Sequence, residues 1–250
     1  MRELRIIPVT TPIEIKPGDR LVEECLSALH RKRLSFAQGD ILVVKHKVVS
    51  KAEGRVVQLA TVQPSADSRA WGQRYKVDPR VIELALRESK SVIRRKNGVL
   101  ITETRHGFIC ANSGVDVSNV DGGAHALLLP ENPDRSAARI HRELRKLTKL
   151  SIPVIISDSF GRPWREGLTE VAIGVAGMKA IHDYRGRRDS HGYPLRATID
   201  AVADELACAA GLLSSKLTRT PFVIIRGFPY EPGRGSSRSL LRPAEQDLFR

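Results

Sequence analysis

Long apolar runs are missing from this chain of 250 residues. No stretch approaches the roughly 20 consecutive apolar residues that a membrane-spanning helix needs. The first residues, 1–7, lead into a short strand-like run without the apolar region of a secretion signal. The composition, 41% apolar and 28% charged, is that of a soluble globular protein with a sizeable core. We therefore expect a cytoplasmic protein that does not contact the membrane.

Cysteine is also scarce. Cys25, Cys110 and Cys208 are odd in number, far apart and set among apolar residues. This pattern excludes a disulfide framework, and the spacing does not match a zinc site. We expect three buried thiols in a reducing compartment.

Acidic and aromatic residues are both in short supply relative to basic ones. Lysine and arginine number 41 against 28 aspartates and glutamates, so the net charge is +13. Such a charge favours anionic partners, whether nucleic acid, a nucleotide or a phosphorylated small molecule. Aromatic residues make up only 5% and do not alternate with a basic stripe, so a single-stranded nucleic-acid platform is disfavoured. Part of the excess is explained by a solvated helix face within 135–149.

Familiar nucleotide-binding motifs are absent. The sequence has no GxxxxGK[ST] loop and no GxGxxG after a strand, which argues against P-loop and dinucleotide folds. Any nucleotide chemistry therefore needs another phosphate cradle. The best candidate is the segment 45–51, KHKVVSK, where we expect a strand end to present lysines to a phosphate. The alternative is an exposed strand edge protected by lysines.

Two aspartates follow apolar runs. The run 107–111 leads to Asp116, and the run 152–156 leads to Asp158. Strands that deliver carboxylates to glycine-containing loops can hold a hard divalent cation. The alternative is that both aspartates are turn residues that cap the strands.

The predicted elements mix strands and helices without a regular alternation, which indicates an α+β fold. We expect Asp19 to cap a helix and Asp78-Pro79 to begin another, whose buried face extends to Val92 and Ile93. The remaining predictions are a hairpin of 99–103 with 107–111, helices over 134–149 and 196–213, and strands over 41–44, 152–157 and 222–225. A tail over 228–250, rich in glycine, serine and arginine, is expected to be loop-like or to contact a partner.

Several segments, taken in order, resemble the coenzyme F420-0:L-glutamate ligase family. They are KHKVVSKAEGR, ANSGVDVSN, ISDSFGRPWREG, GMKAIHDYRGRRDSHGYPL and ADELACAAGLL. The similarity extends from PVTTPIEIKPGD to about Gly227. The resemblance implies a catalytic unit over 1–227, as one body or two interleaved α+β lobes. Its mixed or antiparallel sheets would be flanked by helices, in a fold that is neither P-loop nor Rossmann.

The resemblance also implies a reaction. The family uses GTP, Mg²⁺ or Mn²⁺ and a monovalent cation such as K⁺ to couple L-glutamate to coenzyme F420-0, and to F420-1 where a second glutamate is added. The expected route passes through an acyl phosphate and builds the γ-glutamyl tail in coenzyme F420 biosynthesis. Family members form homodimers, with the 228–250 tail as a candidate dimer contact.

Site residues follow from matching the family's motifs. Metal ligands would be Asp116, Asp158 and Ser159, with Asp116, Asp158 and Lys51 in catalytic roles. The nucleotide would contact Thr11, Pro12, Ile13, Glu14, His46, Lys47, Lys51, Asn119, Ser214, Ser215, Lys216 and Leu217.

Lys216 departs from the pattern, because some relatives place a Glu or Gln ligand for a second cation there. A charged ammonium has no lone pair for a metal. Either Lys216 contacts phosphate directly, or a second ion is held differently or not at all.

Two other functions compete with the ligase hypothesis. A metal-dependent phosphohydrolase would share both aspartates but would need no glutamate. A basic nucleic-acid-binding protein would use the net charge and leave Asp116 and Asp158 without a role; we do not expect nucleic acid to be a partner, because aromatic residues are scarce.

Overall fold

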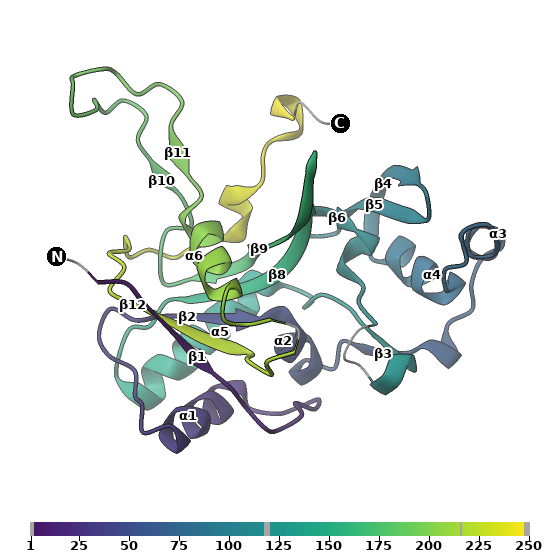
Figure 1. Cartoon of the computed structure of the whole chain (residues 1–250), viewed down its shortest axis with the longest axis horizontal. Coiled ribbons are helices and arrows are strands. Elements are labelled where there is room, and N and C mark those ends of the chain that lie inside the picture. Colours follow the sequence, from purple (N-terminus) through teal and green to yellow (C-terminus); the bar gives the residue numbers. More distant parts are fainter. Residues whose placement is uncertain (1–2, 118–120, 216, 248–250) are drawn as a thin grey trace.

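A five-stranded mixed sheet forms the centre of the computed structural model, which describes residues 3–117, 121–215 and 217–247. Its order across the sheet is β1 (Arg5–Val9), β12 (Phe222–Arg226), β2 (Ile41–Lys45), β8 (Val154–Arg162) and β9 (Arg165–Ala176). Neighbouring strands are antiparallel except β2 and β8, which run parallel (Figure 1). The first and last strands of the chain therefore lie side by side.

Both faces of this sheet are buried. In β2, Leu42 and Val44 face one core, whereas Ile41 and Val43 face the other. Helices α1 (Leu21–Arg31) and α5 (Pro133–Thr148) cover the first face, and α6 (Val202–Gly211) covers the second. Burial on both faces explains why β2 is an unbroken apolar run and does not alternate with polar residues.

A second group of elements is inserted between α2 (His46–Ala52) and α5. It consists of β3 (Val56–Gln58), α3 (Ala66–Tyr75), α4 (Pro79–Arg87), β4 (Ser89–Lys96), β5 (Val99–Thr104), β6 (Ile109–Ala111) and β7 (His125–Leu127), with single 3-10 turns at Leu59–Thr61, Asn112–Gly114 and Asp121–Gly123. Strand β3 pairs with β7, and β4, β5 and β6 form a three-stranded sheet. A separate apolar cluster that includes Leu84 and Ala126 supports this part. The division of the chain into a unit over 1–227 and a tail stays a prediction.

Two segments extend from this body. Strands β10 (His182–Asp183) and β11 (Ile199–Asp200) form the base of an arm that projects away from the sheet (Figure 1). The described part of the tail contains 3-10 turns at Ser237–Leu240 and Ala244–Gln246 and an isolated bridge between Pro232 and Met178. It is fastened to α5 because Asp134 accepts hydrogen bonds from Ser236 Oγ (2.6 Å) and Ser237 N (2.8 Å). A dimer contact by the tail stays a prediction.

The α+β class is confirmed, with mixed and antiparallel sheets and neither a P-loop nor a Rossmann arrangement. The predicted hairpin is β5 with β6. The predicted cap of α4 is also correct, because Asp78 Oδ1 accepts from Arg80 N at 2.9 Å and Pro79 occupies the first turn. Helix α5 and strand β12 lie where they were expected.

Two helix predictions need correction. Arg20, and not Asp19, occupies the position before α1; Asp19 Oδ2 accepts from Lys16 N at 2.7 Å and stabilises the preceding turn. Helix α4 ends at Arg87, so Val92 and Ile93 lie on β4, because the chain turns back there to pair with β5.

Two element boundaries were also wrong. The helix predicted over 196–213 starts only at Val202, because 199–200 pair with β10. The strand predicted over 152–157 extends to Arg162, because β9 pairs with it along its whole length. Asp158 therefore lies within a strand and not at its end.

The three cysteines are free thiols, as expected. Cys25 and Cys110 are buried, and burial raises the pKa of each to about 12, whereas Cys208 is only half-buried. In the described part of the chain, no helix has both the length and the apolar character that crossing a bilayer requires.

Candidate active site

The centre of the site is the point where β2 passes directly into α2. The sequence predicted a strand end over 45–51, but Lys45 ends the strand and the next seven residues form a helix. The helix forms because His46, Val49 and Ser50 share one buried face, with His46 Nδ1 and Ser50 Oγ 3.5 Å apart. Lys47 and Lys51, four residues apart, consequently lie on one side of α2.

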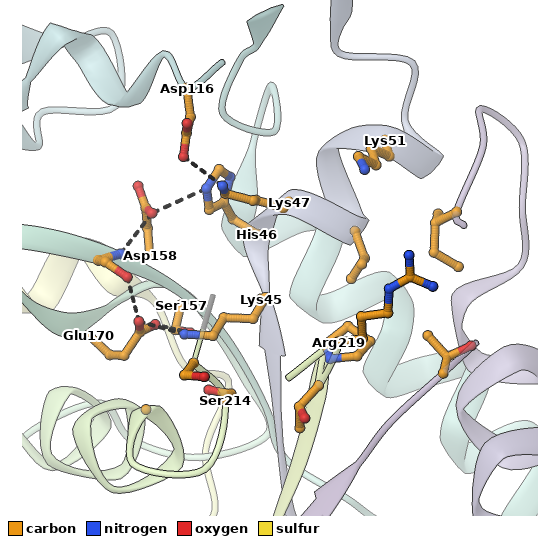
Figure 2. A pocket seen from close by; sticks show the side chains of 18 of the residues that line it. Lys45, His46, Lys47, Lys51, Asp116, Ser157, Asp158, Glu170, Ser214 and Arg219 are labelled. Atoms are coloured by element: carbon orange, nitrogen blue, oxygen red, sulfur yellow. Dashed lines mark hydrogen bonds and ion pairs between the residues drawn. The ribbon is translucent and has the colours of Figure 1, made fainter. Parts of the chain in front are cut away.

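Three consecutive basic residues at this junction each face an acidic residue from a different segment (Figure 2). The pairs are Lys45 Nζ with Glu170 Oε1 at 2.5 Å, His46 Nε2 with Asp158 Oδ1 at 3.1 Å, and Lys47 Nζ with Asp116 Oδ2 at 2.6 Å. The acids come from β9, from β8 and from the segment that pairs with Leu127 of β7. The parallel pairing of β2 with β8 and the β8–β9 hairpin bring the first two acids to this end of β2.

The three pairs line a cavity of about 660 Å³. Its walls come from the loop after β1, the β2–α2 junction, Asp116, the middle of the β8–β9 hairpin and the segment between α6 and β12. Segments more than 200 positions apart in the chain thus meet here, because β1, β12 and β2 are neighbours in the sheet.

Most of the predicted site residues meet in this cavity. They are Thr11, Ile13, Glu14, His46, Lys47, Lys51, Asp116, Asp158, Ser159, Ser214, Ser215 and Leu217. Pro12 lies in the same loop but is exposed and is not part of the cavity wall. Asn119 and Lys216 lie outside the described residues, so their predicted nucleotide contacts remain predictions.

The loop after β1 is tied to its surroundings by polar contacts. The Thr11 hydroxyl donates to Glu24 and accepts from Ile13 N at 3.2 Å. Glu14 pairs with Lys51 of α2, and Thr11 N donates to Arg219 O at 3.3 Å. These contacts close one side of the cavity, where Figure 2 shows Lys51 and Arg219 across from the three acids.

Sequence reasoning missed Glu170, Ser157 and Arg219 as lining residues. Glu170 is buried and stands directly opposite Ser159 in the β8–β9 register. The sequence could have indicated Glu170, because it directly precedes the apolar run 171–176, much as Asp158 follows the apolar run 152–156. Arg219 had no such signal, since it follows α6 in an irregular segment.

The donors of this cavity suit a hard divalent cation. Carboxylate oxygens of Asp116, Asp158 and Glu170 and the hydroxyl of Ser159 are the ligand types that Mg²⁺ and Mn²⁺ prefer. Within the described residues, no group of three or more histidine, cysteine or acidic side chains is already arranged around a common point. Each carboxylate instead faces a cationic or protonatable group of the chain, so a metal ion held by Asp116 and Asp158 would have to take the place of their contacts with Lys47 and His46.

A smaller cavity of about 300 Å³ adjoins the first across Glu170. Its walls are Ser159, Leu168, Thr169, Glu170, Cys208, Gly211 and Leu212. Burial raises the pKa of the Cys208 thiol, and the nearby carboxylates of Asp204 and Glu170 raise it further. A raised pKa lowers the share of thiolate, which is the nucleophilic form of cysteine.

Comparison with known proteins identifies the family. A family model described as F420-0:Gamma-glutamyl ligase matches residues 9–227. The chain is 45% identical over 236 residues to the coenzyme F420:L-glutamate ligase of Methanothermobacter thermautotrophicus, which covers 93% of each chain. It is 42% identical over 252 residues to the coenzyme F420:L-glutamate ligase of Methanopyrus kandleri, with 99% of this chain and 98% of the relative covered. The chain therefore belongs to the F420-0:gamma-glutamyl ligase family, and it is a ligase.

Proposed function

We propose that this chain adds L-glutamate to coenzyme F420-0 with GTP as co-substrate, through an acyl phosphate, in coenzyme F420 biosynthesis. L-glutamate and coenzyme F420 stand in the names of its relatives, and F420-0 stands in the description of the family model. The observation that carries the proposal is the row of three acid–base pairs in one cavity. A reaction that moves a phosphoryl group needs both cations for phosphate and carboxylates for a metal ion, and this row supplies both.

The cationic side chains account for nucleotide binding without a P-loop. Lys47, Lys51 and Arg219 line the cavity on two sides, and lysines bind phosphate as point charges. His46 lies beside them at the start of α2. Together these groups replace the glycine-rich loop that other nucleotide-binding folds use.

Asp116, Asp158 and Ser159 would hold Mg²⁺ or Mn²⁺, with a monovalent cation such as K⁺ in support. When bound, such an ion would supply charge neutralisation on the phosphate and would help to align the transfer. The residues of the chain position the carboxylates: Asp158 Oδ1 accepts from Ser159 N at 2.7 Å and contacts His46, which orients this carboxylate toward the cavity.

The reaction consists of two displacements. A carboxylate oxygen of F420-0 attacks the γ-phosphorus of GTP, the bond from that phosphorus to the β,γ-bridging oxygen breaks, and GDP leaves. The glutamate ammonium loses one proton to solvent, and the resulting amine attacks the acyl carbon. The bond from that carbon to the phosphate oxygen breaks, the nitrogen loses a second proton as the amide forms, and phosphate leaves. The cavity contributes by holding the reactants together and by keeping water from the acyl phosphate.

The test is to incubate the protein with GTP, Mn²⁺, L-glutamate and F420-0 and to measure the mass of the acceptor. We expect a gain of one glutamyl unit, or of two if F420-1 is also used. GTP hydrolysis that ignores both glutamate and acceptor would contradict the proposal and support a phosphohydrolase. Oligonucleotide binding that depends steeply on salt and survives Asp116→Ala would instead support nucleic-acid binding.

We also propose that the protein is a cytoplasmic homodimer, as the resemblance implies. Sedimentation of the purified chain tests the dimer, and a monomer at micromolar concentration would contradict it.

A further inference from the structure

Glu170 is the most buried of the three carboxylates in the row of acid–base pairs. Its side chain is 9% exposed, against 14% for Asp158 and 29% for Asp116. It accepts hydrogen bonds from Ser157 Oγ at 2.7 Å and from Ser159 Oγ at 2.5 Å, in addition to its pair with Lys45. Because three donors already converge on it, this carboxylate is suited to hold groups in place and is poorly placed to take a proton from substrate.

The packing around Glu170 leaves it little freedom to move. A Cβ atom added at Gly211, at the end of α6, would lie 2.6 Å from Glu170 Cγ, so only glycine permits this approach. The backbone carbonyl of Glu170 also accepts from Cys208 Sγ at 3.0 Å. Helix α6 on one side and β8 on the other therefore fix the carboxylate.

Glu170 stands at the boundary between the two cavities. Four residues line both of them: Ser159, Leu168, Glu170 and Gly211. The larger cavity carries the cationic side chains proposed for nucleotide, whereas Glu170 is the one charged group among the described residues that line the smaller cavity. The smaller cavity thus suits a part of the acceptor that carries no phosphate charge.

Lys45 is the cation at this boundary. Its ammonium group lies against Glu170, on the acid side of the cavity in Figure 2, and its side chain is 21% exposed. Lys51 by contrast pairs with Glu14 in the loop after β1. Lys45 lines the larger cavity and contacts the smaller one through its ion pair with Glu170.

We propose that Lys45 binds the carboxylate of the acceptor while that carboxylate takes the γ-phosphoryl group, and that Glu170 is the positioning residue that holds Lys45 Nζ and Ser159 Oγ at the boundary. This inference rests on the proposed function. In the step concerned, the acceptor oxygen forms a bond to the γ-phosphorus as the bond to the β,γ-bridging oxygen breaks. The ammonium group of Lys45 offsets the negative charge that gathers between the two anions.

The experiment uses Lys45→Met and Glu170→Gln in the full chain. Positional isotope exchange in GTP labelled with ¹⁸O at the β,γ bridge, with F420-0 present and glutamate absent, reports the first displacement alone. We expect exchange to fall about 100-fold in Lys45→Met and about tenfold in Glu170→Gln, with a raised KM for F420-0 in both. The Kd of a non-hydrolysable GTP analogue with Mn²⁺ should stay within about threefold of wild type, because the nucleotide contacts remain.

Glu103→Gln is the matched control. Glu103 is a similarly buried glutamate that accepts from Lys90 (3.0 Å) and from Ser91 Oγ (3.2 Å), but it lies on β5, away from both cavities. It should leave exchange and the KM for F420-0 unchanged, which separates positioning from a general loss of a buried carboxylate. If Lys45→Met does not fold, Glu170→Gln, which preserves the size of the side chain, still decides the question.

Two results would overturn the placement: unchanged exchange in both variants, or lost nucleotide affinity with an unchanged KM for F420-0. Failure of the proposed function gives a different result. A wild-type protein that shows neither exchange nor glutamyl transfer would overturn the proposed function and this inference together.

Discussion

The two ends of strand β2 carry the same kinds of charged residue in very different settings. Before the strand, Asp40 is fully buried and forms two contacts with Arg226, Nε to Oδ1 at 2.8 Å and Nη2 to Oδ2 at 2.9 Å. After the strand, three basic residues meet three acids along the wall of a cavity. One end is closed by the protein itself, and the other is open to a ligand.

The ion pair at the first end supports the fold, whereas the ion pairs at the second end can open so that their charged groups bind a ligand. The guanidinium of Arg226 matches both oxygens of Asp40 in a fixed fork, and Asp40 also accepts from Ala37 N at 2.8 Å. Asp40 is fully buried, so a ligand does not reach it. A lysine ammonium is a mobile point charge that can turn from a carboxylate to a phosphate. We therefore expect substitutions at the first end to change stability and substitutions at the second end to change activity.

The largest effect is expected from Asp116→Ala and Asp158→Ala. Each removes a carboxylate proposed to hold the metal ion and should lower kcat for glutamyl transfer by about 100- to 1,000-fold. Urea denaturation should show little change in stability for Asp116→Ala, because Lys47 is partly exposed and can still reach solvent. Asp158→Ala should lower the free energy of unfolding by about 1–3 kcal/mol, because it leaves Nε2 of the buried His46 without that carboxylate. Near-normal turnover in either variant would remove that aspartate from the metal site.

Asp40→Ala should show the reverse behaviour. The substitution leaves the Arg226 guanidinium without its carboxylate and should lower the free energy of unfolding by about 3 kcal/mol. This value is at the low end for a broken buried ion pair, because part of Arg226 reaches solvent. Urea denaturation measures this loss, and the KM for GTP should not change at a temperature where the variant is folded. If Asp40→Ala instead raised the KM for GTP and left stability unchanged, the two ends of β2 would not have separate functions.

Lys51→Ala tests the cavity on the side away from the acids. Loss of this ammonium should raise the KM for GTP about tenfold, because one charged contact to phosphate is lost, and should change the KM for F420-0 much less. Initial rates at varied GTP and varied acceptor separate the two constants. An unchanged dependence on GTP would contradict the placement of Lys51 on the nucleotide side.

The contrast also shows which features were predictable from the sequence. Asp78-Pro79 marks the start of α4 because a capping carboxylate and a proline act within a few residues. The apolar runs of β2 and β12 are likewise local signals. The approximate positions of Asp116 and Asp158 followed from similar runs and from the resemblance, and the structure places both in one cavity.

Long-range pairing was not predictable in the same way. That Lys45 faces Glu170 depends on two registers, Lys45 opposite Ser157 across β2–β8 and Ser159 opposite Glu170 across β8–β9. A shift of one residue in either register would turn these side chains to the other face of the sheet. The helix at 46–52 was also not predicted. A basic segment that follows a strand has no residue pattern that distinguishes the start of a helix from a continuation of the strand.

The smallest effect is expected in thermal unfolding with ligand. GTP with Mn²⁺ at about 100 times its Kd should stabilise the wild type by about 2.7 kcal/mol, or roughly 5–10 °C in Tm for a chain of this size. Asp40→Ala should melt lower but show the same ligand-induced gain, because its cavity is intact. Asp116→Ala should melt near wild type and lose most of that gain. A full gain in Asp116→Ala would mean that nucleotide binds without this carboxylate, and the open end of β2 would then stabilise the nucleotide through its lysines alone.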